Sequence, residues 1–423
     1  MRRRGRKEEA TSLAILRASF RQHFDGEPAL YRAPGRVNLI GEHTDYNAGY
    51  VMPVAIGFYT YVAARARVDG RLRVHSTRFG ETIELPCTEG VARLPRLENA
   101  LHWSEYVWGV AQSLQAHGLA LPGADLLIHS EVPLGAGLSS SAALEMASAL
   151  ALSGSIGAAL DPLTLARLCQ RAENEYVGTR CGIMDQFAAA FGRQGYALCL
   201  DCRSLAYRPV PLDVRVRGGT NRAPARLVIC NSMIRHRLAA GEYSLRREQC
   251  ERAAAVLGGA LPRVHTLRDV TPDDLERVRA PLGELLHRRS RHVVTENERV
   301  AAAAVALEAG DHVGFGRLMV ESHRSLASDY EVSCDELDLL VRLALELDGV
   351  YGARMTGGGF GGCTVNLVRA EVVERFRVTI AERYEQATGQ RPETYVCPSA
   401  DGAAYFSSEP SSGSQSWQRV SPA

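Results

Sequence analysis

A glycine- and serine-rich segment in the first half of the chain has the residue types needed to bind phosphate. It reads VPLGAGLSSSAALE over residues 132–145, with glycines at 135 and 137 and serines at 139–141. Glycines let the backbone approach a ligand, and the free N–H groups at a helix start favour an anion. Serine hydroxyls add donors and an oxygen ligand for a hard metal ion. A helix merely capped by serine is the simpler alternative, but a cap needs one serine. We therefore predict a phosphate site.

A second segment concentrates hydrogen-bonding side chains around a glycine turn. It reads APGRVNLIGEHTDYN over residues 33–47 and places Glu42, His43 and Asp45 within four positions. Such a density of donors and acceptors suits a ligand with many hydroxyl groups, since each hydroxyl needs both. A metal site is the rival interpretation, although only one histidine is present, and an exposed turn is the simplest one.

A third segment, MTGGGFGG at residues 355–362, contains the spacing G-x-G-x-x-G. A dinucleotide-binding fingerprint must open a helix and be followed by an acidic residue about 20 positions later. Residues 363–368, CTVNLV, instead have the composition of a strand. We therefore interpret the glycines as a loop between two strands, which either lies near a ligand or only turns a corner.

Charge and composition exclude several classes of protein. The only lysine is Lys7, so neither a Walker P-loop nor Schiff-base chemistry is expected. With 49 basic and 48 acidic residues the net charge is +1, which argues against a nucleic-acid binder. Ten scattered cysteines indicate reduced thiols, and the single C-x-x-C, Cys199 and Cys202, lacks the second pair of a zinc site. No apolar run approaches the length of a membrane span.

The hydrophobic pattern predicts strands and helices that position the first two motifs. Alternation indicates a strand over 59–68 that continues as a hairpin into 71–76, and a further strand leads from 126 to 132 into the phosphate loop. Residues 141–151 have the composition of a buried helix. The next helix is delimited by a cap at Asp161, proline at 162 and glycine at 178.

The rest of the chain forms a second half. Residues 206–225, rich in proline, glycine and arginine, are the expected border. Beyond it we expect a strand at 227–230, long helices around 242–257 and 291–309, and a strand pair near 353–368. The basic segment 287–292, HRRSRH, is interpreted as the solvated start of a helix. These elements predict an α+β protein in two halves.

Taken together, the three motifs resemble those of the galactokinase family, one of the small-molecule kinases related to homoserine and mevalonate kinases. Further agreement comes from CGIMDQF at 181–187, EYSLRR at 242–247 and RHVVTEN at 291–297, and the resemblance spans about residues 14–407. Position 48 is alanine where the family often has glycine.

The resemblance implies a two-lobed α+β sugar kinase of the galactokinase and mevalonate kinase type. Its N-terminal lobe would be similar to ribosomal protein S5 and its C-terminal lobe ferredoxin-like, with the active site between them. We expect a flexible basic start (1–13), an N-terminal lobe (14–205), a C-terminal lobe (206–407) and a disordered tail (408–423).

The reaction implied is phosphorylation of the C1 hydroxyl of α-D-galactose by Mg·ATP. By resemblance, Asp185 would be the catalytic base, and Arg36 would hold that carboxylate ionised and neutralise charge on the phosphoryl group. Mg²⁺ would bind Ser141 and Glu173. The other implied site residues are Glu42, His43, Thr44, Asp45, Gly182 and Tyr243 for the sugar, and Ser76, Trp103, Gly135, Ala136, Gly137, Leu138, Ser139 and Ser140 for ATP.

Two alternatives remain open at this stage. One is a kinase for N-acetylgalactosamine or a related sugar, since the motifs leave the C2 substituent undecided. The other is a regulator that binds sugar and ATP without catalysis, although Ser139–Ser141, Arg36 and Asp185 are all intact. We expect a cytoplasmic monomer or weak dimer with no nucleic-acid or membrane partner.

Overall fold

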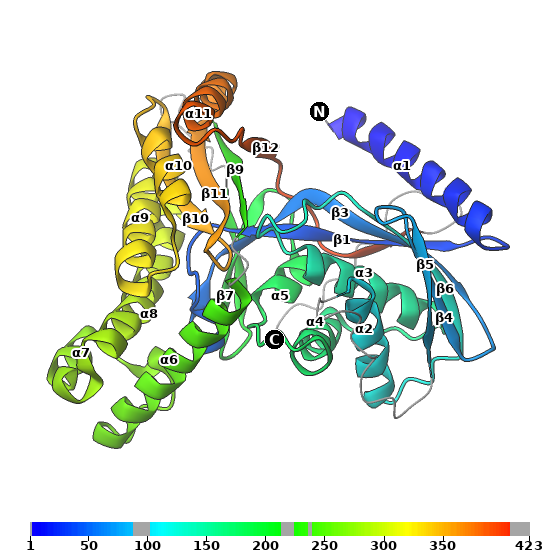
Figure 1. Cartoon of the computed structure of the whole chain (residues 1–423), viewed down its shortest axis with the longest axis horizontal. Helices are drawn as coiled ribbons and strands as arrows, with labels where there is room; N and C mark the ends of the chain where they lie inside the picture. Colours follow the sequence, from blue (N-terminus) through cyan, green and yellow to red (C-terminus); the bar gives the residue numbers. More distant parts are fainter. Residues whose placement is uncertain (1, 88–101, 213–223, 236–238, 407–423) are drawn as a thin grey trace.

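The computed structural model describes residues 2–87, 102–212, 224–235 and 239–406. Two bodies of strands and helices lie side by side, and the long strands β1 and β3 run toward the junction between them (Figure 1). The expected tail at 408–423 lies outside the described residues. None of the helices in the described ranges combines the length and apolar character needed to cross a membrane.

The first body is built on a six-stranded sheet. In spatial order its strands are β13 (Ala404–Phe406), β1 (Ala29–Asn38), β3 (Pro53–Ala66), β6 (Gly123–Ser130), β4 (Arg71–Ser76) and β5 (Glu81–Pro86). Only the β4–β6 pair is parallel. The predicted hairpin of 59–68 with 71–76 is therefore wrong, because β6 lies between those two strands. Local alternation marks each strand but carries no information about which strand it pairs with.

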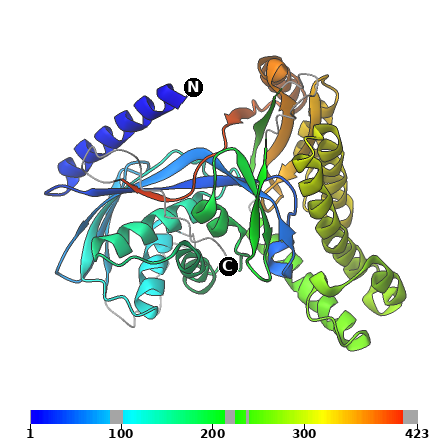
Figure 2. The ribbon, with the colours of Figure 1, turned by 180° about the vertical axis from the view of Figure 1, so that it is seen from behind.

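Helices cover both faces of this sheet (Figures 1 and 2). Helix α1 (Arg2–His23) lies on one face, where Leu16 and Phe20 pack against Leu30, Tyr61 and Leu127. Its backbone includes residues 2–13, which we expected to be flexible. The other face carries α2 (Ser104–Ala116), α3 (Ser140–Ser155), α4 (Pro162–Arg171) and α5 (Met184–Phe191).

The capping aspartate, the proline and the glycine correctly predict where the helical segment that starts with α4 begins and ends. The Asp161 carboxylate accepts hydrogen bonds from the backbone N–H groups of Leu163 and Thr164 at 3.0 Å. The helix continues into a π-helical turn, Ala172–Val177, and stops at Gly178, whose φ of 94° is left-handed. The π turn itself had no signal in the sequence.

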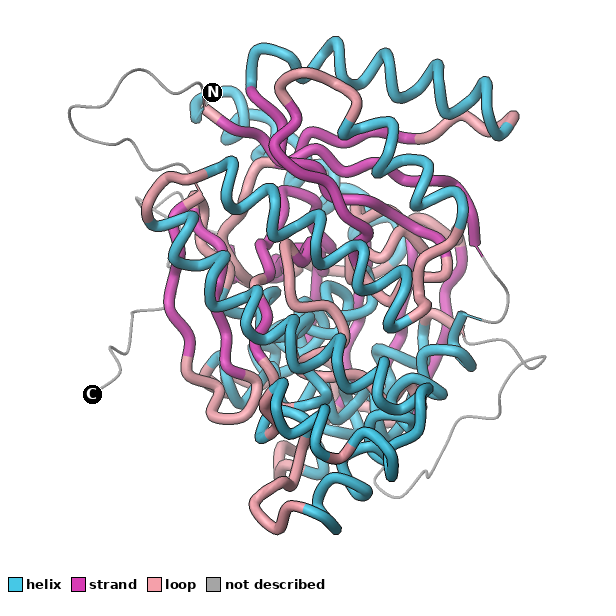
Figure 3. Tube along the Cα trace, turned by 90° about the vertical axis from the view of Figure 1, so that its left-hand side faces the viewer, coloured by secondary structure: helices cyan, strands magenta, loops and turns pink. Residues whose placement is uncertain are grey.

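The second body contains a four-stranded antiparallel sheet and most of the long helices. The strand order is β10 (Val350–Thr356), β11 (Gly361–Arg369), β9 (Ala225–Arg235) and β12 (Glu393–Cys397). Figure 3 shows the long helices in front of these strands. The helices are α6 (Ala239–Ala260), α7 (Pro272–Arg277), α8 (Arg279–Glu308), α9 (His312–Ser325), α10 (Asp335–Leu345) and α11 (Val373–Thr388).

The chain passes between the bodies more than once. A three-stranded sheet joins β2 (Tyr50–Val51), β7 (Tyr196–Asp201) and β8 (Tyr207–Pro211), so the expected border at 205–206 falls within the β7–β8 hairpin. Strand β13 returns to pair with β1. A shared apolar core, which includes Val37, Met52 and Val54 from one body and Phe315, Met319 and Val365 from the other, fixes their junction.

Apart from the exposed Arg291, the basic segment 287–292 is mostly buried, which corrects our interpretation. It lies inside α8, and His287, Arg289, Ser290 and His292 are buried. The Arg289 guanidinium donates to Gln249, to the Asp329 carbonyl and to Glu331. The Arg289 guanidinium can be buried because each of these N–H groups has an acceptor. A local charge pattern cannot reveal acceptors that come from other helices.

Helix α9 crosses β10 where Gly316 of the helix faces Gly352 of the strand. A Cβ at Gly316 would lie 1.9 Å from the Tyr351 carbonyl oxygen, so Gly316→Ala must separate the helix from the sheet. We expect it to lower the free energy of unfolding by about 3 kcal/mol. The midpoint of urea unfolding measures this change. Gly259→Ala, in α6 with open space around it, is the matched control and should be neutral or slightly stabilising. Equal midpoints for the two variants would contradict the close approach.

Candidate active site

The loop between β6 and α3 exposes backbone while its apolar side chains anchor it. Gly135 and Gly137 are exposed with φ of 66° and 71°, whereas Ala136 and Leu138 are fully buried. Ser139, at φ 57°, directly precedes the first residue of α3. Helix α3 therefore begins directly after the two exposed glycines, and glycine backbone next to the free N–H groups of a helix start suits a phosphate.

The third glycine segment packs on this loop. It joins β10 to β11, as predicted, and no helix follows it. A Cβ at Gly357 would lie 3.1 Å from the Gly137 carbonyl oxygen, and one at Gly137 would lie 3.3 Å from that of Thr356. The segment therefore does more than connect two strands, since its backbone packs directly against the backbone of the phosphate loop at Gly137.

Arg36 and Asp185 form a two-point ion pair beside the loop. The Nε and Nη2 atoms of Arg36 lie 2.7 and 2.8 Å from the two carboxylate oxygens of Asp185. Nη1 donates to the Gly137 carbonyl at 2.6 Å, and the Ser139 hydroxyl also donates to Asp185. Arg36 comes from β1 and is buried, whereas the Asp185 side chain, in the first turn of α5, remains 26% exposed. The pair thus presents a carboxylate to a ligand next to the phosphate loop.

A cavity of about 320 Å³ opens in front of this pair. The predicted residues that line it are Arg36, Glu42, His43, Asp45, Glu173, Gly182, Asp185 and Tyr243, together with the glycines at 357–359. These residues come from both bodies, so the predicted sugar site and the phosphate loop meet at the junction of the two halves. Thr44 is not among them. Its hydroxyl donates within the turn, to the carbonyls of Gly41 and Tyr50, and its contact with a sugar stays a prediction.

Glu42 is held by groups far away in the sequence. Its buried carboxylate accepts from Arg354 Nη1 at 3.0 Å, Thr356 Oγ1 at 3.1 Å and the Gly357 N–H at 2.7 Å, and also from Asn38. Sequence reasoning missed Arg354 and Thr356 as partners because nothing local links them to residue 42. Glu42 therefore ties the sugar segment to the start of the third glycine loop.

His43 and Asp45 differ in charge state. The pKa of His43 is lowered to about 3 by burial and by the neighbouring His292 and Arg246, so the ring is neutral. Its Nδ1 lies 2.7 Å from the Tyr46 hydroxyl. Burial, with a smaller effect from the charge of Asp185, raises the pKa of Asp45 to about 6. The sugar segment thus offers a neutral ring and a carboxylate that titrates near neutrality.

Helix α8 holds the backbone of the sugar segment. The Gly41 N–H donates to the Glu296 carboxylate at 2.9 Å, and the Tyr50 N–H donates to the Asn297 side chain at 2.8 Å. His292 Nε2 lies 3.1 Å from the Glu42 carbonyl oxygen. The sequence motif at 291–297 therefore supports the backbone of the sugar segment, and its residues are not among those that line the cavity.

Ser141, in the first turn of α3, hydrogen-bonds to the carboxyl group of Glu173, which comes from the π-helical turn. The pKa of Glu173 is raised to about 7 by burial and by the charge of Asp185, against hydrogen bonds from Cys181, Gln186 and Ser141. Gln186 Nε2 also reaches Glu145, another buried carboxyl whose pKa burial and Glu173 raise well above its usual range. Within the described ranges no basic side chain forms an ion pair with either glutamate. These donors fit a magnesium ion, which takes one or two protein oxygens and keeps waters and phosphate oxygens as its other ligands.

In the described parts of the chain, no group of three or more His, Cys, Asp or Glu side chains is arranged to hold a metal by itself. The Cys199 and Cys202 thiols form no disulfide.

Ser76 and Trp103 lie together but away from the cavity just described. Ser76 is opposite Glu81 in the β4–β5 register, and the Trp103 indole N–H donates to the Glu81 carboxylate at 2.5 Å. Phe79 stacks on Trp103 with ring planes 8° apart. Ser76 also pairs with Ile128 on β6, the strand that leads into the phosphate loop. The two residues thus flank the end of the sheet from which the loop emerges.

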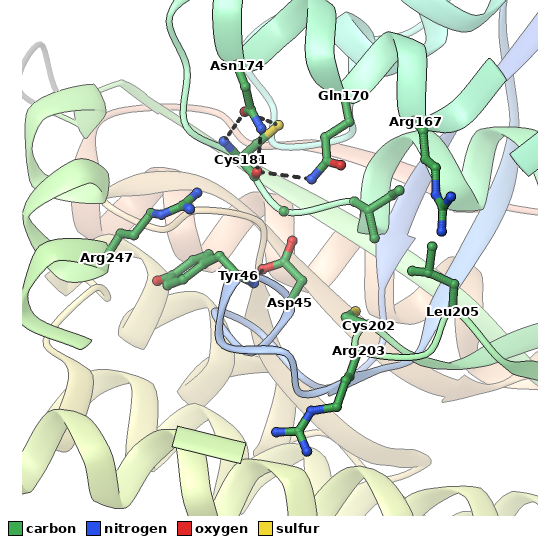
Figure 4. A pocket seen from close by; sticks show the side chains of 12 residues that line it. Asp45, Tyr46, Arg167, Gln170, Asn174, Cys181, Cys202, Arg203, Leu205 and Arg247 are labelled. Atoms are coloured by element: carbon green, nitrogen blue, oxygen red, sulfur yellow. Dashed lines mark hydrogen bonds between the residues drawn. The ribbon is translucent and has the colours of Figure 1, made fainter. Parts of the chain in front are cut away.

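A second, open cavity of about 500 Å³ lies behind the sugar segment (Figure 4). It shares Asp45, Cys181 and Gly182 with the first cavity. These three residues therefore form a thin wall between the two spaces.

Comparisons with known proteins agree with this geometry. The chain matches the galactokinase galactose-binding signature over residues 18–66, the GHMP kinase N-terminal domain over 105–193 and the GHMP kinase C-terminal domain over 303–386. It is 48% identical to a galactokinase of Chloroflexus aggregans, with 93% of this chain and 97% of the relative covered. The human galactokinase is 45% identical, with 93% and 96% covered.

Solved structures show the same relationship. The galactokinase of Lactococcus lactis, crystallised with galactose, superimposes with a TM-score of 0.86 at 36% identity, covering 93% of this chain and 99% of that one. The mevalonate kinase of Methanococcus jannaschii, at 16% identity and a TM-score of 0.59, shares the fold over 89% of this chain and all of its own. The predicted two-lobed α+β kinase fold is confirmed, and the chain belongs to the galactokinase family of the GHMP kinases.

Proposed function

We propose that this protein transfers the γ-phosphoryl group of ATP to the C1 hydroxyl of α-D-galactose, giving galactose 1-phosphate and ADP. The observation that carries this proposal is the position of the Arg36–Asp185 pair, between the loop at 135–141 and the cavity that contains Glu42, His43 and Asp45. The family relationship and the galactose complex of the Lactococcus lactis relative support the choice of sugar.

Each residue of the site has a role that follows from its contacts. Asp185 accepts the proton of the C1 hydroxyl as the hydroxyl oxygen bonds to phosphorus and the bond to ADP breaks. Arg36 bridges Asp185 and the phosphate loop, so its charge stabilises the negative charge on the transferred group. Backbone N–H groups and hydroxyls at 135–141 hold the phosphates, which replaces the lysine of a P-loop. Ser141 and Glu173 would hold Mg²⁺, which supplies positive charge at the phosphate oxygens.

The cavity side chains would orient the sugar. Asp45 and the Gly182 backbone lie in contact. The His43 and Tyr243 rings contact each other, with centroids 5.4 Å apart, and both line the same cavity. A carboxylate, a neutral imidazole and a phenol together supply acceptors and donors for neighbouring hydroxyls. In this arrangement Glu42 acts mainly by fixing the segment, because protein donors already occupy its carboxylate.

A coupled assay of ADP release tests the proposal. With Mg·ATP and a panel of hexoses, galactose should give the highest kcat/KM. A kcat/KM at least tenfold higher for N-acetylgalactosamine would identify that sugar, and not galactose, as the substrate. Binding of sugar without turnover would instead favour a non-catalytic regulator.

A cytoplasmic setting, which the sequence predicts, agrees with ten unpaired cysteines.

The raised pKa of Asp45 predicts an acidic limb in the pH profile. Below about pH 6 this carboxyl gains a proton in the free enzyme, and it then loses its charge as an acceptor for sugar hydroxyls. We expect kcat/KM for galactose to fall as the pH drops through 6. The measurement is the profile from pH 5 to 8 for the native enzyme and for Asp45→Asn. The variant should be less active throughout and lack this limb; an unchanged limb would assign the titration to another group.

A further inference from the structure

The wall between the two cavities is an irregular stretch of chain. Residues 178–182 follow the π-helical turn and have no regular structure before α5. A Cβ at Gly182 would lie only 2.0 Å from Asp45 Oδ2, so the Gly182 backbone is packed directly on that carboxylate. A displacement of residues 181–182 would therefore move one side of the sugar cavity. Such a segment needs an external support to keep one position.

The Asn174 side-chain amide supplies the two-point part of that support. Arg247 Nη1 also donates to the Arg180 carbonyl at 2.8 Å, and the Cys181 N–H is shared with the Thr179 carbonyl at 2.8 Å. The Cys181 N–H donates to Asn174 Oδ1 at 2.8 Å, and Asn174 Nδ2 donates to the Cys181 carbonyl at 3.3 Å. Gln170 adds a longer bond, 3.4 Å, to the same carbonyl. Figure 4 shows Asn174 directed at Cys181 from the helix above it. Asn174 thus pairs with both backbone polar groups of Cys181, in the way that a neighbouring strand would.

The π-helical turn lets two consecutive side chains serve different sides of the site. In an α-helix consecutive side chains diverge by about 100°. Here Glu173 and Asn174 both lie 3.4 Å from the Cys181 thiol. Glu173 continues toward Gln186 and the nucleotide side, whereas the Asn174 amide is used entirely on Cys181. π turns of this kind occur often at functional sites.

We propose that Asn174 is a positioning residue for sugar binding: it fixes the Cys181–Gly182 backbone against Asp45 and has no direct part in nucleotide binding. The inference rests on the proposed function, since it assigns this role for galactose. Asn174 should therefore affect the binding of galactose and not that of Mg·ATP, whereas a residue that only stabilises the fold would affect both.

The test compares Asn174→Ala and the isosteric Asn174→Asp with the native enzyme. Loss of the paired hydrogen bonds should raise the KM for galactose about tenfold. The KM for Mg·ATP should stay within about twofold, because the Glu173 contacts to Gln186 do not involve this amide. Gln170→Ala, which removes only the long bond to the same carbonyl, is the matched control and should change neither constant more than about twofold. Thermal melting of each variant shows whether it is folded.

The outcomes separate the possible failures. Equal increases in both KM values, or unchanged constants in a folded Asn174→Ala, would overturn the positioning role. If the alanine variant does not fold, the aspartate variant decides, since it keeps the acceptor for the Cys181 N–H but loses the donor. If the native enzyme does not phosphorylate galactose, the proposed function fails first, and galactose binding measured by calorimetry then tests the role of Asn174 alone.

Discussion

Replacing Asp185 by asparagine is expected to lower kcat with galactose by about a thousandfold, while the affinity for Mg·ATP changes little. Asparagine is isosteric and keeps one acceptor oxygen for Arg36, while its NH2 group takes the place of the oxygen that accepts from Arg36 Nη2 and Ser139. It cannot take the proton of the C1 hydroxyl. The loss should therefore appear in the chemical step rather than in folding or nucleotide binding.

Single-turnover kinetics and calorimetric titration with Mg·ATP check this result. Asp161→Asn is the matched control, because Asp161 only caps α4 and asparagine caps a helix equally well. Its kcat should equal that of the native enzyme. An Asp185→Asn enzyme that kept more than a tenth of the native kcat would remove Asp185 from the role of base.

Arg36→Lys has the second large expected effect, a fall in kcat of about a thousandfold. The guanidinium makes three separate N–H contacts, two to Asp185 and one to the Gly137 carbonyl. A lysine ammonium keeps the charge but is a point donor on a flexible stem, and it cannot span the carboxylate and the loop together.

Steady-state constants for both substrates measure this effect, with melting curves to confirm folding. Arg65→Lys provides the control for the same change at another ion pair. Arg65 binds Asp125, which Arg67 and Arg73 also hold, at the end of the sheet far from the phosphate loop. Its kcat should remain within about twofold of the native value. If Arg36→Lys behaved like Arg65→Lys, charge alone at this position would suffice, and the two-point geometry would have no catalytic importance.

Local elements and the chemistry they carry could be predicted from the order of the amino acids. The helix after Asp161 could be predicted because its cap, its proline and its terminal glycine act within one turn of each end. The phosphate loop could be predicted for the same reason, since glycines, serines and the following helix are adjacent in the chain. Asp185 and Arg36 became candidates through resemblance, and no pattern in the residues alone would have paired them.

Which distant groups meet depends on the packing of the whole chain. Arg36 and Asp185 are 149 positions apart, and Glu42 and Arg354 are 312 apart. Three further features were likewise not predicted: the place of β6 between β3 and β4, the burial of Arg289 and His292 in α8, and the hydrogen bonds of Asn174 to Cys181. The physical reason is the same in each case. Helix caps and turns are set by hydrogen bonds within a few residues, whereas strand order, burial and the partners of a charged side chain depend on how the whole chain packs.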